Sequence, residues 1–233
     1  MPDKHLSSQF DSELEGVSAR VLTMGALVES QIRRAMHSLS ELHNEEASLV
    51  VQDDGRVNAM EMEIDQELSS IIARRQPTAR DLRLLIAISK TTANLERVGD
   101  EAAKIARMVK SIIQSGSGPM LPSTELRLES DLALGLLRKA LDAFAARDTT
   151  AALAILKEDD LIDREFDGFV RKLITYMMED PRTISASLDL LFVAKAIERI
   201  GDHAKNIAEF IIYIVKGADV RHTPMDRVES AVG

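Results

Sequence analysis

An internal duplication constrains the fold of this chain more than any other feature of the sequence. The stretch 96–106 returns in related form at 198–208, and each residue of the second copy follows its counterpart by 102 positions. Both copies open with Glu, Arg, a β-branched residue, Gly and Asp. Recurrence of this kind is typical of proteins that repeat one structural unit, so we expect two halves of the same architecture.

The duplication extends beyond this stretch. At a separation of 105 residues, 33–36 corresponds to 138–141 and 54–58 corresponds to 159–163. The change from 105 to 102 is what a helix connection of altered length would produce. The turn-rich stretch 115–123 lies almost midway along the 233 residues and is predicted to join the two halves.

Apolar residues recur every three or four positions along most of the chain, which is the spacing of amphipathic helices. The first such stripe consists of Leu14, Val17, Val21, Met24, Val28, Ile32, Ala35 and Leu39. Aromatic residues make up only 3% of the chain, and 11 Gly and 6 Pro provide few turns for a β-rich fold. We therefore predict an all-α protein of two tandem, sequence-related three-helix bundles with six long helices.

The expected boundaries follow from the stripes and from the prolines, which push the preceding residue out of the helical region. The helices of the first half are expected near 14–39, 45–75 and 78–112, and those of the second half end near 147, 178 and 217. The predicted domains are 8–114 for the first bundle, 115–122 for a linker, 123–217 for the second bundle and 218–233 for a flexible tail.

Composition excludes several classes of function. A formal net charge of −9 argues against nucleic-acid binding, which needs a basic surface. The absence of Cys excludes disulfides and thiolate metal sites, so any metal is held by oxygen or imidazole ligands. The longest apolar run, 210–215, is much shorter than the roughly 20 residues of a membrane span, and the first residues lack the apolar stretch of a signal peptide. We expect a soluble, cytoplasmic protein.

Each copy of the repeated stretch places two carboxylates four residues apart on one helix face. The pairs are Glu96 with Asp100 and Glu198 with Asp202. Like charges at this spacing are mildly destabilising unless they share a positive partner. In the first copy Lys104 offers that partner on the helix surface, but Asn206 stands at its position in the second copy. Solvated surface and metal ligation are about equally compatible with the spacing alone.

The surrounding residues favour a metal site. Gly99 and Gly201 lie between the paired carboxylates, at a cost of about 1 kcal/mol each relative to Ala in a helix, and allow close approach of a second helix. Tight packing alone would also explain them. Further oxygen ligands precede them on the neighbouring helices: Asp54 and Asn58 in the first half, Asp159 and Asp163 in the second, with Glu61 and Asp65 repeating the spacing. Such ligands suit Mg²⁺, Ca²⁺, Mn²⁺ or iron.

Other familiar site chemistry is missing from the sequence. No Glu precedes a His by three residues as in di-iron bundles, and there is no phosphate-binding loop, dinucleotide fingerprint or His-Glu-x-x-His motif. His203, beside Asp202, is a further candidate ligand, although we expect it to be exposed.

At these residues the sequence resembles the PhoU family of phosphate-transport accessory proteins, whose two repeats carry Glu/Asp-x-x-x-Asp motifs. Residues 96–100 and 198–202 match that motif, and the similarity extends from about residue 10 to residue 217. The resemblance implies two three-helix bundles and a metal-binding site in each. Its residues are Glu96, Asp100, Glu198, Asp202, Asp159, Asp163, Asp54 and Asn58. Asn58 departs from the family pattern, so the two sites are expected to differ in charge.

The resemblance also implies a function. Proteins of this family regulate phosphate homeostasis: they repress the phosphate-starvation response and modulate phosphate uptake, bridging the phosphate ABC transporter ATPase and a membrane sensor histidine kinase. The resemblance implies that the protein has no catalytic residues. It also implies carboxylate-bound metal ions such as Fe, Mn, Mg, Ca or Zn, a homodimer, and recruitment to the inner membrane through partners. Two alternatives stay open from the residues: a metal-dependent phosphatase with paired ions, and a helical scaffold without metal.

Overall fold

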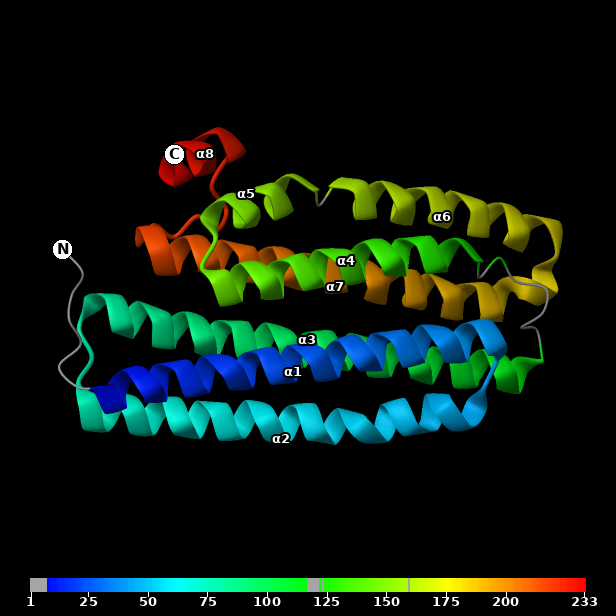
Figure 1. The fold of residues 1–233 in the computed structure, drawn as a ribbon. Coiled ribbons are helices and arrows are strands. Elements are labelled where there is room, and N and C mark those ends of the chain that lie inside the picture. Colours follow the sequence, from blue (N-terminus) through cyan, green and yellow to red (C-terminus); the bar gives the residue numbers. More distant parts are fainter. Residues whose placement is uncertain (1–7, 117–121, 123, 159) are drawn as a thin grey trace.

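The computed structural model describes all residues except 1–7, 117–121, 123 and 159 (Figure 1). Its elements are α1 (Ser8–Glu41), α2 (Asn44–Arg75), α3 (Ala79–Ser115), α4 (Thr124–Ala146), α5 (Thr149–Glu158), α6 (Asp160–Glu179), the 3₁₀ helix η2 (Pro181–Thr183), α7 (Ile184–Lys216) and α8 (Met225–Val232). The described residues form no β-strand. The prediction of an all-α fold with two repeated helical halves is therefore confirmed.

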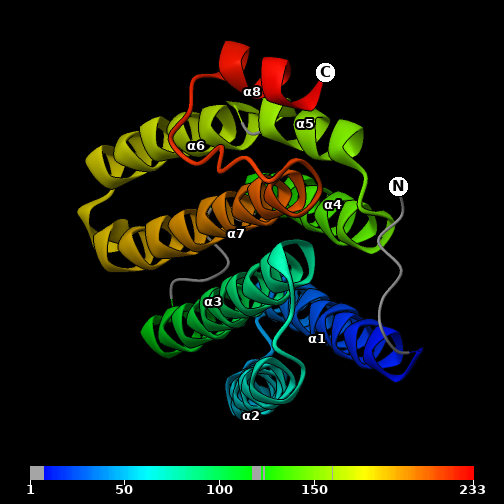
Figure 2. The same cartoon turned by 90° about the vertical axis from the view of Figure 1, so that its left-hand side faces the viewer.

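The helices lie side by side along one common direction. Figure 2 shows α2 on one outer side, α5 and α6 on the opposite outer side, and α1, α3, α4 and α7 between them. Each half thus contributes an outer helix or helix pair, which carries one set of candidate ligands, and two inner helices. Apolar stripes of the inner helices meet in a continuous core, whose largest fully buried side chains include Met24, Ile88, Leu95 and Leu137.

Two predicted helix ends are confirmed by their capping geometry. Gln76, which precedes Pro77, adopts the left-handed conformation with φ 47°, and its N–H donates to the carbonyl of Ile72 at 3.1 Å. Gly217 closes α7 with φ 72° and donates to the carbonyl of Tyr213 at 3.0 Å. Glycine adopts this conformation without a Cβ penalty.

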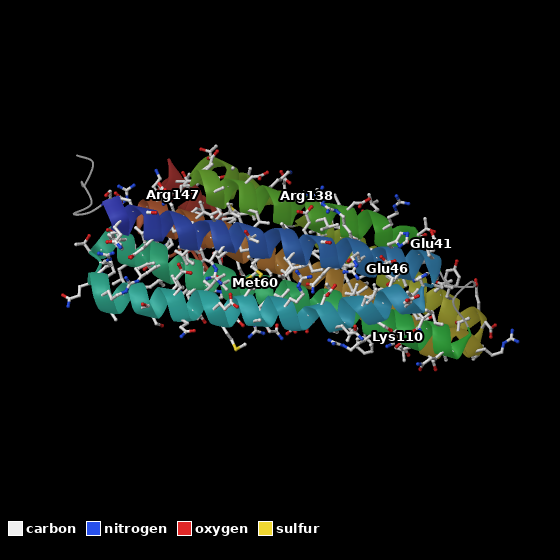
Figure 3. The ribbon with its side chains drawn as sticks, turned by 60° about the horizontal axis from the view of Figure 1, so that its bottom comes forward. Glu41, Glu46, Met60, Lys110, Arg138 and Arg147 are labelled. Carbon is white, nitrogen blue, oxygen red and sulfur yellow. The ribbon has the colours of Figure 1, made fainter. Side chains whose placement is uncertain are left out.

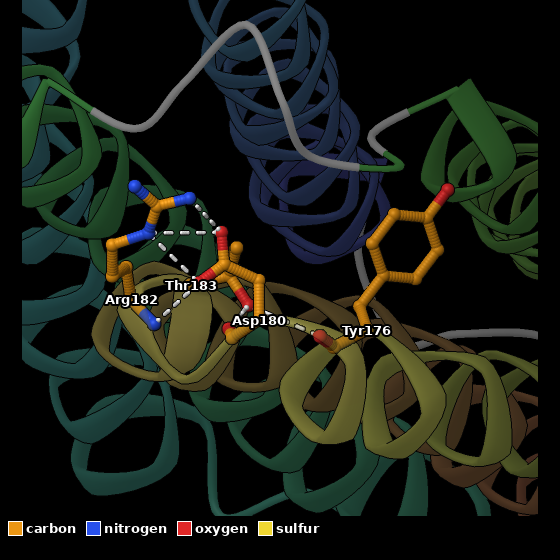
Figure 4. A network of polar contacts seen from close by, with 4 residues as sticks. All are labelled: Tyr176, Asp180, Arg182 and Thr183. Atoms are coloured by element: carbon orange, nitrogen blue, oxygen red, sulfur yellow. Dashed lines mark hydrogen bonds and ion pairs between the residues drawn. The ribbon is translucent and has the colours of Figure 1, made fainter.

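The turn from α6 to α7 is closed by a network of polar contacts (Figure 4). The carboxylate of Asp180 accepts from the backbone N–H of Arg182 at 3.0 Å and from its guanidinium at 2.7 and 2.9 Å. The hydroxyl of Thr183 donates to the carbonyl of Asp180 at 2.8 Å. Pro181 begins η2 because it has no N–H to donate, and the helix direction reverses here as the sequence predicts.

One expectation for the second half needs correction, and another falls partly outside the described residues. The helix predicted from 149 to 178 corresponds to α5, which ends at Glu158, and α6, which begins at Asp160, with residue 159 between them outside the described residues. The segment 218–233, expected to be a flexible tail, contains α8, which lies against α5 in Figure 1. Val228 of α8 is only 2% exposed, and Glu229 accepts from Lys157 of α5 at 2.5 Å.

The two halves pack directly on each other through α3 with α7 and α1 with α4. Gly25 of α1 makes room for Leu141, whose Cδ1 would lie 2.6 Å from a Cβ atom at the glycine. Arg138 of α4 forms an ion pair with Glu29 of α1, and Figure 3 shows Arg138 on the helix beside α1. None of the helices in the described ranges combines the length and apolar content that a membrane span needs.

Candidate functional site

The glycines between the paired carboxylates are sites of close helix packing. A Cβ atom at Gly99 on α3 would lie 3.2 Å from Cγ1 of Val57 on α2. A Cβ atom at Gly201 on α7 would lie 2.7 Å from Cδ1 of Ile162 on α6. Val57 and Ile162 are counterparts at the separation of 105 residues, so both halves use the same packing. This packing holds α2 against α3 in the first half, and α6 against α7 in the second, beside the predicted ligands.

In the first half the structure brings the predicted carboxylates together. The pKa of Glu96 is raised, first by burial and then by the charges of Asp100, Glu61 and Asp54. Burial and the charge of Asp100 raise the pKa of Asp54 on α2, and burial followed by Asp65 and Asp100 does the same for Glu61. Residues from α2 and α3 therefore form one acidic cluster, which accumulates negative charge that a cation would neutralise.

Oxygen atoms in this cluster lack partners. Oδ1 of Asp54 and Oδ1 of Asn58 are buried, and neither has a hydrogen-bond partner among the described residues. A buried acceptor without a partner costs about 1–3 kcal/mol. The donor set of Asp54, Asn58, Glu96 and Asp100, all oxygen atoms, fits a hard cation.

The second half is less complete. Oε1 of Glu198 accepts from Lys195 at 2.7 Å, whereas its Oε2 is buried and has no described hydrogen-bond partner. Asp163 and Asp202 are exposed, and each has a polar or electrostatic interaction. Asp159 lies outside the described residues. The structure thus places Glu198 in a partly buried position with one unpartnered oxygen.

Within the described part of the chain, no three His, Asp or Glu side chains converge closely enough to hold a metal ion directly. Metal ligation by the predicted residues therefore requires that side chains move or that water molecules complete the ligand shell. It stays a prediction.

The sequence offered Lys104 as the positive partner of the Glu96 and Asp100 pair, but Lys104 pairs with Glu101 instead. Its ammonium lies 3.4 Å from Oε2 of Glu101, and Oε1 of Glu101 accepts from Arg199 of α7 at 3.0 Å. Glu101 is 6% exposed, so this ion pair joins the two halves in a nearly buried position. Lys104 contributes to the interface between repeats rather than to the predicted acidic pair.

His203 was expected to be exposed, but it is only 8% exposed. Its Nδ1 lies 2.9 Å from Oδ1 of Asn94 on α3, and the amide nitrogen of Asn94 donates to the carbonyl of Lys90. Since Oδ1 of Asn94 is thereby the acceptor, Nδ1 of His203 carries the proton. Burial, followed by the charges of Arg199 and Arg97, lowers the pKa of His203 to about 4. The helix interface buries this ring, which spacing on α7 alone did not reveal.

Besides Glu101, sequence reasoning missed a second buried carboxyl group, that of Glu129. Glu129 of α4 is 1% exposed, and its Oε1 has no hydrogen-bond partner among the described residues. Burial, followed by the charges of Glu165 and Glu198, raises its pKa to about 8. The available signal was its position three residues after Leu126 and four before Ala133, within the apolar stripe of the fourth helix.

Comparison with known proteins places the chain in a family. The PhoU domain model matches residues 21–109 and 126–211, one match in each half. A phosphate-specific transport system accessory protein PhoU homolog from Burkholderia sp. is 53% identical over 95% of both chains. The phosphate-specific transport system accessory protein PhoU of Escherichia coli K12 is 46% identical over 97% of this chain and 93% of its own.

A solved structure agrees with these matches. The crystal structure of PhoU from Pseudomonas aeruginosa superposes with a TM-score of 0.85 at 44% identity, covering 90% of this chain and 100% of that one. The matched regions contain the repeated acidic motifs and the packing glycines described above. By repeat, by fold and by near full-length similarity, this chain belongs to the PhoU family.

Proposed function

We propose that this protein is a regulatory accessory protein of a phosphate transport system, which represses the phosphate-starvation response and modulates phosphate uptake. The observation that carries the proposal is the similarity, over nearly the whole length of both chains, to relatives named phosphate-specific transport system accessory proteins. Those names describe accessory proteins rather than enzymes, which supports a regulatory role without catalysis.

The proposed role is that of an adaptor. The protein would contact the ATPase of the phosphate ABC transporter and a membrane sensor histidine kinase at the cytoplasmic side, and report the state of one to the other. Long rigid helices offer extended faces for such docking, and a homodimer would present two sets of them. The docking of helical faces is supported by several large apolar side chains of α6 and α7 that are exposed: Ile174, Met178, Ile184, Leu188 and Phe192.

Metal binding by the acidic motifs is part of the proposal. In the first repeat Asp54, Asn58, Glu96 and Asp100 would hold the ion, and in the second Glu198, Asp202, Asp163 and Asp159. The unpartnered buried oxygens of Asp54, Asn58 and Glu198 support it. A bound cation would neutralise the clustered carboxylates and tie each outer helix to its inner neighbour.

The adaptor role is tested by association. Tagged protein is incubated with detergent-solubilised transporter and, separately, with the sensor kinase, and retained protein is quantified. We expect both to be retained, and a Phe192→Asp variant to lose binding if the exposed apolar face is used. Leu49→Asp, at an exposed apolar residue of α2, is the matched control. Retention of neither membrane protein would contradict the adaptor role.

Metal binding is tested separately. Elemental analysis of protein purified without chelators is expected to find metal, and the Glu96→Ala/Glu198→Ala variant is expected to lose it. Metal-free wild-type protein that takes up no divalent cation would contradict this part of the proposal while leaving the association experiment untouched.

A further inference from the structure

A polar side chain lies in the core of the first repeat where the second repeat has a hydrocarbon side chain. Gln31 of α1 is 1% exposed, and its counterpart at the separation of 105 residues is Leu136, which is 4% exposed. Neither Oε1 nor Nε2 of Gln31 has a hydrogen-bond partner among the described residues. A buried amide without partners is destabilising relative to an apolar residue of similar shape. Packing alone therefore does not explain why this position is polar.

The carboxamide of Gln31 lies where α1, α2 and α3 meet. A Cβ atom at Gly99 on α3 would lie 3.4 Å from Oε1 of Gln31 and 3.5 Å from Cβ of Val57 on α2. Asn58 follows Val57 directly, and Asp54 precedes Val57 by about one helical turn. The carboxamide is thus next to the turn of α2 that carries two of the candidate ligands.

The hydrogen-bonding groups that lack partners at this junction are complementary. Nε2 of Gln31 is a buried amide nitrogen with N–H donors, whereas Oδ1 of Asp54 and Oδ1 of Asn58 are buried acceptors. No direct hydrogen bond joins the donor to either acceptor. A water molecule can accept from one donor and donate to two acceptors, and a buried water typically makes about three hydrogen bonds. One enclosed water would therefore satisfy all three groups.

The second repeat has a different arrangement at the equivalent positions. Leu136 offers no hydrogen bond, and Asp163, the counterpart of Asn58, is exposed. Asn58 is only partly exposed, and its oxygen is buried. Burial of the polar side chain on α2 therefore accompanies the polar residue on α1.

We infer that Gln31 is a positioning residue of the first-repeat acidic cluster, and that it holds the side chains of Asp54 and Asn58 through a water molecule enclosed between α1, α2 and α3. Each of the two oxygens has a second lone pair, so the water link leaves both residues able to contact a cation. The inference rests on the proposed metal role for its functional meaning, whereas the water link itself does not depend on metal.

The water link is tested by urea unfolding in EDTA. Gln31→Leu, which places the second-repeat residue at this position, is measured in the wild-type protein and in a background that carries Asp54→Ala and Asn58→Ala. Thr91→Val is the matched control, because Thr91 of α3 is 0% exposed and its hydroxyl also lacks a partner among the described residues. Gln31→Met serves if the Leu variant does not fold.

We expect Gln31→Leu to lower the urea midpoint of the wild-type protein, because it leaves Asp54 and Asn58 without their donor. In the background without these two acceptors it is expected not to lower the midpoint, since only an amide is then lost from the core. Thr91→Val is expected not to lower the midpoint in either protein. A shift caused by Gln31→Leu that is the same in both proteins, whatever its sign, would overturn the inference.

The positioning role is tested by Mn²⁺ binding followed by electron paramagnetic resonance. The parent protein carries Glu198→Gln and Asp202→Asn, so that the second-repeat motif does not contribute ions. We expect Gln31→Leu to raise the Kd of the first-repeat ion about tenfold or more, and Thr91→Val to leave it unchanged. Parent-like affinity in Gln31→Leu would overturn the positioning role. A parent that binds no Mn²⁺ would instead contradict the proposed metal role, and the unfolding series would still decide on the water link.

Discussion

Ile162 on α6 packs over the bare backbone of Gly201 on α7, where a Cβ atom would lie 2.7 Å from Cδ1 of the isoleucine. The first repeat has the same arrangement, with 3.2 Å between Cγ1 of Val57 and a Cβ atom at Gly99. In both repeats the inner helix thus carries its acidic pair on either side of a glycine against which a side chain of the outer helix packs closely. The glycine is explained by packing, and packing sets the helix separation on which any shared ion depends.

A methyl group at this contact is expected to be costly. Gly201→Ala should lower the free energy of unfolding by about 1–3 kcal/mol through overpacking, despite the better helix propensity of Ala. Ile162→Val should cost about 0.5–1.5 kcal/mol. The double variant should lose less than the sum, because Val lacks the clashing Cδ1. Urea unfolding of the four proteins measures the coupling, and strict additivity would show that the two residues do not share this contact.

The ion pair between Glu101 and Arg199 stabilises the interface between repeats. Arg199→Met should lower the unfolding free energy by about 1–3 kcal/mol, because nearly buried Glu101 keeps only the longer contact with Lys104. Glu101→Gln in that background should recover part of the loss. Arg97 is the repeat counterpart of Arg199, and the counterpart of Glu101 is His203, which is uncharged. Arg97→Met is therefore the matched control and should cost less. Equal losses for both arginines in denaturant unfolding would refute this assignment.

His203 makes stability depend on pH. Its pKa is lowered to about 4 in the fold, below the ordinary 6.5, so the unfolded chain binds more protons between these values. The unfolding free energy should therefore rise with pH across this window. The contribution of His203, up to about 3 kcal/mol, should disappear as the pH falls through it. In EDTA, His203→Gln should flatten the profile from pH 4.5 to 7, whereas exposed His222→Gln should not. An unchanged profile in His203→Gln would contradict the buried neutral ring.

A substitution that disrupts the packing of the C-terminal helix α8 is expected to detach this helix without unfolding the rest of the second half. Val228→Asp should release α8 from α5 because the valine is 2% exposed there. Hydrogen exchange should then accelerate in 225–232 while the amides of α7 keep their protection, since few contacts join α8 to the rest. Arg227→Asp, at an exposed position of the same helix, is the control. Loss of protection throughout the second half would show that α8 is part of the core instead.

Local signals in the sequence predicted most of the fold. The three-to-four spacing located the helices of the first half, Pro77 located the end of α2, and Gly217 located the end of α7 in the second half. Val228 and its neighbours form a stripe too short to distinguish a docked helix from a tail without knowledge of its contacts.

The candidate site was predicted only in part. Spacing on single helices placed Glu96 with Asp100, and the sequence also named Asp54 and Glu61 on the preceding helix as companions. The structure brings these α2 carboxylates near enough to Glu96 for their charges to raise its pKa. The burial of His203 and Glu129 depends on which helix faces meet between α3 and α7 and between α4, α6 and α7. These helix–helix contacts join residues far apart in the chain, and periodicity along one helix does not predict them.

Repression of the phosphate-starvation response by this protein can be measured by deleting its gene and following a phosphate-starvation reporter in cells grown with abundant phosphate. We expect high reporter expression despite the phosphate, and restored repression when the wild-type gene is returned. Reporter expression that stays repressed in the deletion strain would contradict it.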